Sequence, residues 1–277
     1  MTRKDKIRIA MLLVLWLVVF YPIYPDMVHT WLDHSDNSHA FLVPFIAFYF
    51  VWEKRHELAT ARLGSSAWGG GILAASLFVF VASYAGGIAF SARIAMVGAL
   101  FGLVWFCLGN NFIRILAFPI SFLFFMVPVP DSLISRVSLP LQLLATRLSA
   151  KMIESCSIPV YREGNMLYFI QTQLEVAEAC SGIRSIVSLL MLSMIFCYFS
   201  RGGWWRKTLL VAATIPIAMT ANVFRVMGTG ILAHFYGDRV ARGFLHQFSG
   251  LVIFAFSLAV MFLVHVLINR GRTEHVR

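Results

Sequence analysis

Uncharged apolar runs recur along the whole chain, separated by short polar segments. They cover residues 9–24, 35–52, 68–88, 94–108, 115–129, 186–199, 208–224 and 247–268. A helix needs about 20 apolar residues to cross the ~30 Å hydrocarbon layer, and the flanks of the shorter runs can supply the missing turn. The pattern predicts an all-α polytopic membrane protein with about eight transmembrane helices. We expect one integral-membrane domain over residues 1–277, with its core at about 30–268 and a tail at 269–277.

The composition supports this reading. Apolar residues make up 59% of the chain, charged residues only 13%, and the mean hydropathy is +0.78. A soluble domain has about 25% charged residues, and a globule of this size cannot hide so much apolar surface from water. A soluble enzyme and a nucleic-acid-binding module are therefore excluded, and membrane lipid is the expected surrounding.

If successive spans cross the membrane in opposite directions, the net charge of +10 is distributed unevenly between its two sides. With the N-terminus in the cytoplasm, cytoplasmic segments hold 14 of the 23 Lys and Arg and 4 of the 13 Asp and Glu. The outer segments hold 9 of each, so the whole excess lies on one side, as the positive-inside rule expects. The basic start also resembles a signal peptide, but no small-x-small cleavage site follows the first run. We expect an uncleaved first span and both termini in the cytoplasm.

The longest outer segment, residues 128–184, carries a helical pattern. Its apolar residues recur at spacings of three and four: Leu133, Val137, Leu141, Leu144, Leu148 and Met152. The spacing predicts an amphipathic helix on the outer membrane surface, bent at Pro140, and a seam packed against other helices is the alternative. The following residues 158–175 contain β-formers around Gly164-Asn165, which indicates a small β-hairpin over the site.

Cys180 has the most distinctive setting among the candidate nucleophiles. It lies in the segment Glu178-Ala179-Cys180-Ser181-Gly182-Ile183-Arg184, just before the sixth apolar run. Free backbone N–H groups at a helix N-terminus and the charge of Arg184 favour a thiolate. The N–H groups of Ser181 and Gly182 can receive an oxyanion. The alternative is that these small residues only cap a helix.

The other cysteines point to no chemistry of their own. Cys107 and Cys197 lie inside apolar runs, where a cysteine usually acts as a small hydrophobe. Cys156 and Cys180 are both predicted on the outer side of the membrane, so a disulfide between them is a possible alternative.

Arg225 and His246 fall on the same predicted side as Cys180. Arg225 ends the seventh run, with Asn222 one turn earlier, and a charge at the edge of a span often faces a polar cavity. For Arg225, the alternative is a side chain that reaches the membrane interface and pairs with Glu175 or Glu178. For His246, the alternative is a structural role at the interface. A Cys–His pair with a cation is sufficient for acyl transfer.

The sequence offers little support for a metal site or a cofactor site. The segment 33–39 combines histidines with aspartates, but a solvated loop explains these residues equally well. We expect no metal and no cofactor.

With these motifs, the chain resembles the exosortase/archaeosortase family of membrane cysteine transpeptidases. The matches are residues 178–184, residues 216–225, His246, and residues 36–44, where Ala40 replaces a glycine of the family's Ser-His-Gly-x-Leu-Val-Pro segment. The resemblance spans about residues 30–260 and, through His246, indicates the bacterial exosortase type. It implies that Cys180 is the nucleophile, Arg225 the cationic residue and His246 the third member. Supporting or substrate-binding candidates are Arg184, Asn222, Ser181, Gly182, Glu178 and His39.

The resemblance also implies the substrates. They are exported proteins with a C-terminal sorting tail: a Pro-Glu-Pro-like motif, one transmembrane helix and an Arg cluster. The enzyme would cut near the motif through a thioester and pass the new carboxyl end to an acceptor nucleophile of unknown identity. This places the protein in the cytoplasmic (inner) membrane with its active site on the extracytoplasmic side.

Two other functions remain as alternatives from the sequence. One is a non-enzymatic transporter or polysaccharide-export component that binds solute through Arg225 and the acidic outer loop. The other is a membrane thiol oxidoreductase that uses Cys156 and Cys180, although the chain has no Cys-x-x-Cys pair.

Overall fold

The structure is a computed structural model that describes residues 3–33, 35–176, 182–200, 202–237 and 244–269. The chain divides into two compact units, which we call unit 1 (Met1–Pro130) and unit 2 (Asp131–Arg277). The expectation of a single domain remains a prediction.

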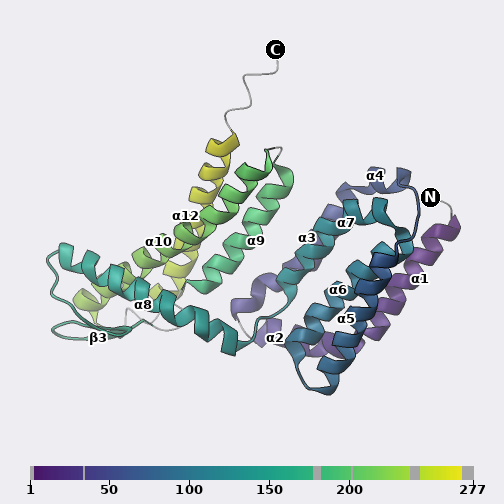
Figure 1. Cartoon of the computed structure of the whole chain (residues 1–277). Coiled ribbons are helices and arrows are strands. Elements are labelled where there is room, and N and C mark those ends of the chain that lie inside the picture. The colour runs from purple at the N-terminus through teal and green to yellow at the C-terminus, as the bar shows by residue number, and fades with distance from the viewer. Residues whose placement is uncertain (1–2, 34, 177–181, 201, 238–243, 270–277) are drawn as a thin grey trace, which may run out of the picture. The chain divides into compact units, whose positions relative to one another are not determined.

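In its described residues, unit 1 is built from helices (Figure 1). They are α1 (Arg3–Val19), η1 (Tyr21–Ile23), α2 (Tyr24–Asp33), η2 (Ser35–Leu42), α3 (Val43–Glu53), α4 (Arg55–Thr60), α5 (Ala67–Ala85), α6 (Ala89–Leu108), α7 (Asn110–Phe122) and η3 (Leu123–Met126). The segment 33–39, for which a solvated loop was one explanation, is therefore helical in its described residues, at the end of α2 and in η2. Met27 and Trp31 are buried one turn apart, and Nε1 of Trp31 donates to the Met126 carbonyl at 2.9 Å.

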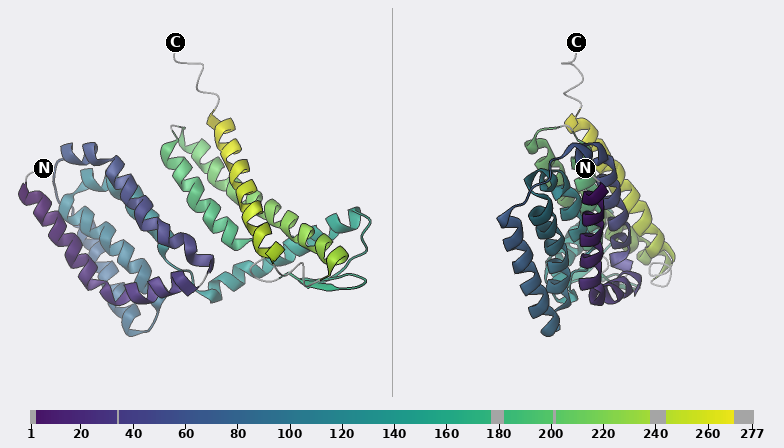
Figure 2. Two further views of the ribbon diagram at one scale, coloured as in Figure 1. Left: turned by 180° about the vertical axis from the view of Figure 1, so that it is seen from behind. Right: turned by 90° about the vertical axis from the view of Figure 1, so that its right-hand side faces the viewer.

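Helices α5 and α6 form a tightly packed antiparallel pair in unit 1, and they lie side by side in both views of Figure 2. The close approach depends on glycine. A Cβ on Gly102 would lie 2.5 Å from the backbone nitrogen of Leu73 and 3.0 Å from the carbonyl oxygen of Gly69. Small residues at such contacts let helix backbones approach in a membrane, where van der Waals packing replaces the hydrophobic effect.

The two ends of unit 1 differ in charge. At one end, Asp5 and Arg8 of α1 line a cavity together with residues 63–65 and 106–108. The Asn111 side chain donates to the Arg62 carbonyl at 3.3 Å, which brings the start of α7 to the same end. The basic positions that the charge pattern assigns to one side thus share one end of this unit. Which side of the membrane this end faces remains a prediction.

Among the described residues, four helices are long and apolar enough to cross a membrane: α5, α6, α10 (Trp204–Tyr236) and the part Gly250–Asn269 of α12 (Phe244–Asn269). Up to six spans result if each of two helix pairs, Ile7–Val19 with Tyr21–Asp33 and Asn110–Met126 with Asp131–Ser155, counts as one. The protein is an all-α polytopic integral membrane protein in general architecture. The count of eight spans is not confirmed, although each apolar run of the sequence falls on a helix.

Unit 2 combines helices with a small sheet (Figure 1). Its elements are α8 (Asp131–Ser155), β1 (Tyr161–Glu163), β2 (Met166–Tyr168), β3 (Gln173–Glu175), α9 (Ile183–Phe199), α10 and α12. The strands are antiparallel in the order β1-β2-β3, with Tyr161 opposite Tyr168 and Met166 opposite Glu175. The turn between β1 and β2 lies at Gly164, whose φ of 58° suits a glycine.

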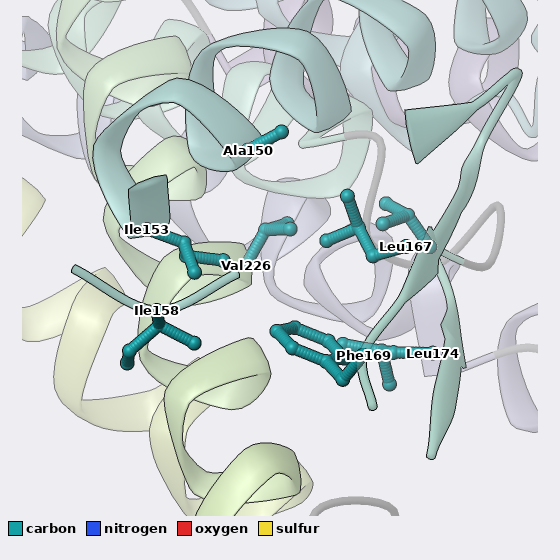
Figure 3. Packing of buried hydrophobic residues seen from close by; sticks show 8 residues of the cluster. Ala150, Ile153, Ile158, Leu167, Phe169, Leu174 and Val226 are labelled. Carbon is teal, nitrogen blue, oxygen red and sulfur yellow. The ribbon is translucent and has the colours of Figure 1, made fainter. Parts of the chain in front are cut away.

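An apolar cluster joins α8, the sheet and α10, as Figure 3 shows. Its buried members are Ala150, Ile153, Ile158, Leu167, Phe169, Leu174, Val176 and Val226. This packing explains why α10 continues to Tyr236, well past the predicted span end at residue 224. Val226, Thr229, Gly230 and Ala233 form a buried face at helical spacing, so the added turns are stabilised by contacts.

Helix α8 turns its apolar face outward. Leu133, Val137, Leu144 and Leu148 are all exposed, at 41–52%. The buried face instead carries polar residues at spacings of four, four and three: Ser138, Gln142, Thr146 and Ser149. An exposed apolar face beside a partly polar buried one fits contact with lipid, and Leu144 and Leu148 also line a groove together with α10. We call these four residues the polar stripe of α8.

Candidate active site

Two polar residues share one face of α10. Asn222 is only 3% exposed, and Arg225, three residues later, is half-buried. The burial of an amide and a guanidinium in a helix that is otherwise apolar enough to span a membrane costs free energy unless both groups have polar partners. Both residues do take part in such interactions. A buried polar turn of this kind marks a site and not ordinary packing.

The start of α9 packs against this turn through Gly182. A Cβ on Gly182 would lie 3.2 Å from both Cβ and Cγ of Asn222, and the residue has φ 85° and ψ −3°. Both the space and the left-handed backbone conformation therefore favour glycine. Because α9 begins at Ile183, Cys180 lies two residues before the helix cap.

Helix α12 approaches the other side of Arg225. A Cβ built on Gly250 would lie 3.6 Å from Nη2 of Arg225, in ordinary van der Waals contact. His246 precedes Gly250 by four residues in the same helix, so the two backbone positions lie on one face. The guanidinium of Arg225 therefore lies against α12 at Gly250, four residues after the chain position of His246.

A second cation lies within electrostatic reach of Arg225. Arg184 occupies the first turn of α9, and the positive charge of Arg225 acts on it. Two arginines that repel each other create a positive potential, which attracts a negatively charged group.

The other end of the cysteine segment is fixed at Val176, which is 2% exposed. Its carbonyl accepts a hydrogen bond from Nε2 of Gln142 on α8 and one from Nδ2 of Asn165, at 3.4 Å for the latter. Its backbone N–H donates to the Asn165 carbonyl at 3.0 Å. Helix α8 also contacts α10, because the Ser149 hydroxyl donates to the Val223 carbonyl at 2.9 Å. Residues on both sides of positions 177–181 are thus held in place.

A family model for the transmembrane exosortases (Exosortase_EpsH) matches residues 31–263. The chain belongs to the transmembrane exosortase family. The comparisons with curated proteins and with solved structures gave no match. Family membership supports a membrane transpeptidase in general, and the match extends over parts of both units.

Within this exosortase, the described residues bring together four of the positions predicted from the sequence. Gly182 and Arg184 at the start of α9 lie beside Asn222 and Arg225 of α10. Glu178, Cys180 and Ser181 lie outside the described residues, as does the side chain of His246. His39 lies in η2 of unit 1 and is partly buried.

Sequence reasoning missed the residues that surround this turn. Gln142, Ser149 and Gly250 contact Val176, Val223 and Arg225 respectively. The helical spacing of Ser138, Gln142, Thr146 and Ser149 was the available signal, since small polar residues in a membrane protein often face another helix.

The remaining cysteines and the acidic residues add no further site within the described parts of the chain. Cys107, Cys156 and Cys197 are free thiols, and Cys180 lies outside the described residues. His29 forms an ion pair with Asp33, and the described residues contain no group of three metal-ligating side chains. The expectation of no metal and no cofactor remains a prediction.

Proposed function

We propose that this exosortase is a membrane-embedded cysteine transpeptidase that processes exported proteins with a C-terminal sorting tail. The tail consists of a Pro-Glu-Pro-like motif, one transmembrane helix and an Arg cluster. Cys180 is the nucleophile, Arg225 the cation and His246 the acid–base residue. The protein lies in the cytoplasmic membrane with both termini in the cytoplasm and its site on the extracytoplasmic side.

The reaction proceeds in two acyl transfers. The Cys180 thiolate attacks the carbonyl carbon of the scissile peptide bond, and the positive charge of Arg225 stabilises the oxyanion. The C–N bond breaks as His246 gives a proton to the leaving amine, which leaves the substrate as a thioester on Cys180. An acceptor nucleophile then attacks the thioester, His246 takes its proton, and the thiolate is released.

The observation that carries the proposal is the convergence of three helices on Arg225. The start of α9 packs against Asn222, one turn before Arg225, and Gly250 of α12, four residues after His246 in the chain, lies against the guanidinium. These contacts bring to one place the chain positions that flank Cys180 and His246. Arg184, Asn222, Ser181, Gly182, Glu178 and His39 stay supporting or substrate-binding candidates.

The test is the processing of a tail-bearing protein in the native cell, followed by mass. In the Cys180→Ala variant, we expect the unprocessed tail to accumulate. The Cys156→Ser variant removes an exposed thiol and serves as the control, with processing unchanged. Normal processing by the Cys180→Ala variant would overturn the proposal. Loss of processing by the Cys156→Ser variant would favour a thiol redox function.

A further inference from the structure

The segment that carries Cys180 begins at a carbonyl group held by a buried side chain. Gln142 is 7% exposed, and its Nε2 donates to the carbonyl oxygen of Val176, four residues before Cys180. Asn165 also donates to this oxygen, at 3.4 Å. Because 3.4 Å exceeds the usual N–H···O range, Gln142 supplies the stronger of the two side-chain hydrogen bonds.

The same helix fixes the turn that bears the cation. The Ser149 hydroxyl, two turns after Gln142 on the polar stripe of α8, donates to the Val223 carbonyl between Asn222 and Arg225. A single rigid helix therefore holds the entry to the cysteine segment at Val176 and the Arg225 turn of α10. At the exit, Gly182 packs on Asn222.

We infer that Gln142 is a positioning residue that sets the Cys180 segment relative to Arg225. This inference rests on the proposed function. Gln142 acts through the Val176 carbonyl and forms no bond to substrate. Acyl transfer requires the nucleophile and the cation in a defined geometry, and a displacement of about 1 Å can lower the rate about a hundredfold. Loss of the hydrogen bond frees the start of the segment while the apolar cluster around Val176 remains.

Replacement of the Gln142 amide by an apolar group of similar size distinguishes a role in positioning from a role in packing. A leucine fills a similar volume without a buried polar group, so packing alone is preserved or improved by Gln142→Leu. Thr146, one turn later on the same stripe, offers a matched control. It is fully buried, and its hydroxyl donates to the Gln142 carbonyl within α8 at 2.7 Å, whereas Gln142 donates to Val176.

The first experiment measures kcat and KM for a tail-bearing substrate with the purified full-length enzyme in lipid nanodiscs. We expect Gln142→Leu to lower kcat about tenfold to a hundredfold and to change KM less than about threefold. Thr146→Val is expected to keep kcat within about twofold. Equal losses in the two variants would show that any lost buried hydrogen bond in α8 has this effect, and would overturn the inference.

A second variant keeps the inference testable even if Gln142→Leu fails to fold. In Gln142→Glu the introduced carboxyl group can donate to the Val176 carbonyl only when it is protonated, and burial raises its pKa above the usual ~4.3. The kcat of this variant relative to the unmodified enzyme at the same pH should therefore rise as the pH falls. A ratio that is flat with pH, or that falls with acid, contradicts a hydrogen-bond donor role.

The Cys180→Ala variant, assayed in parallel, separates the two possible failures. If Cys180→Ala still processes the tail, the proposed function fails. If Cys180→Ala is inactive while Gln142→Leu retains full kcat, the function stands and Gln142 has no positioning role.

Discussion

Arg93 and Arg225 both lie in helices that are apolar enough to cross a membrane, and their surroundings differ. Arg93 of α6 is 7% exposed, and its Nη2 donates to Asp26 of α2 at 2.6 Å and to the Thr30 hydroxyl at 3.3 Å. Arg225 of α10 lies against Gly250 of α12 and within electrostatic reach of a second cation, Arg184. Arg93 has a carboxylate at hydrogen-bond distance. Arg225 acts on the positive charge of Arg184 and takes part in further interactions as well.

The difference indicates which arginine serves structure and which serves chemistry. The carboxylate of Asp26 neutralises Arg93, so this pair ties α2 to α6 within unit 1. The two positive groups near Asn222 in unit 2 instead suit a negative group that arrives with the substrate or forms during acyl transfer. Variants of Arg225 and Arg93 distinguish the chemical role from the structural one.

The largest expected effect is the loss of activity on replacement of Arg225. The Arg225→Lys variant keeps the charge but loses the planar fork of donors, and we expect kcat/KM to fall about 10²–10³-fold. The measurement is tail cleavage per folded enzyme, with folding followed by thermal unfolding. The Arg93→Lys variant is the matched control and should keep activity within about threefold. A similar loss in both variants would remove the distinction between the arginines.

A smaller loss is expected when the contact beside Arg225 is disturbed. In Gly182→Ala the new Cβ meets Asn222 at 3.2 Å in a left-handed backbone conformation, so the start of α9 must shift. We expect cleavage to fall about tenfold or more, as misplacement of reacting groups does. Gly164→Ala is the control, because Gly164 also has positive φ but has nothing within 4 Å of its Cβ position. Equal effects would show that backbone strain alone is responsible.

Replacement of Arg93 should affect stability more than chemistry. Arg93→Ala leaves the carboxylate of Asp26 without its arginine, and we expect a lower Tm with cleavage per folded molecule within about threefold. Because Asp26 is 66% exposed, water moderates this cost. The double variant Arg93→Ala with Asp26→Ala should recover part of the Tm. A loss of cleavage without a change in Tm would instead make Arg93 part of the chemistry.

The smallest effect on cleavage is expected at the α5–α6 contact. A Cβ on Gly102 would lie 2.5 Å from the Leu73 backbone nitrogen, whereas Gly71 on the same pair has nothing within 4 Å. Gly102→Ala should lower the Tm and the yield of folded protein, while Gly71→Ala should leave both nearly unchanged. Cleavage per folded molecule should stay the same in both. The role of unit 1 would need revision if the folded Gly102→Ala enzyme lost its turnover.

Much of the architecture could be predicted from the sequence because apolar runs form helices in a membrane. The family resemblance, carried by the motifs at residues 178–184 and 216–225, is confirmed by the match over residues 31–263. Gly182 packs on Asn222, and Arg184 lies within electrostatic reach of Arg225, while the roles of these residues stay a prediction. Sequence position alone was informative here, because helix ends on one side of a membrane lie at similar depth.

The features that could not be predicted depend on contacts between distant parts of the chain, which local sequence patterns do not reveal. The leucine pattern of α8 correctly indicated a helix, but it left open whether lipid or protein covers that face, and the buried face proved to be Ser138, Gln142, Thr146 and Ser149. The extension of α10 to Tyr236 was missed because packing against the sheet stabilises it. The ion pair of Arg93 with Asp26 joins residues 67 positions apart, a distance at which spacing gives no signal.

The covalent state of Cys180 during turnover tests the proposed chemistry most directly. The purified exosortase is mixed with a tail-bearing substrate, quenched in acid, digested and examined by mass spectrometry. We predict a substrate fragment joined through its new carboxyl end to the peptide that contains Cys180. The fragment should be absent in Cys180→Ala and undiminished in Arg93→Lys. Cleaved tail without any acyl group on Cys180, or the same adduct in Cys180→Ala, would contradict a thioester at this residue.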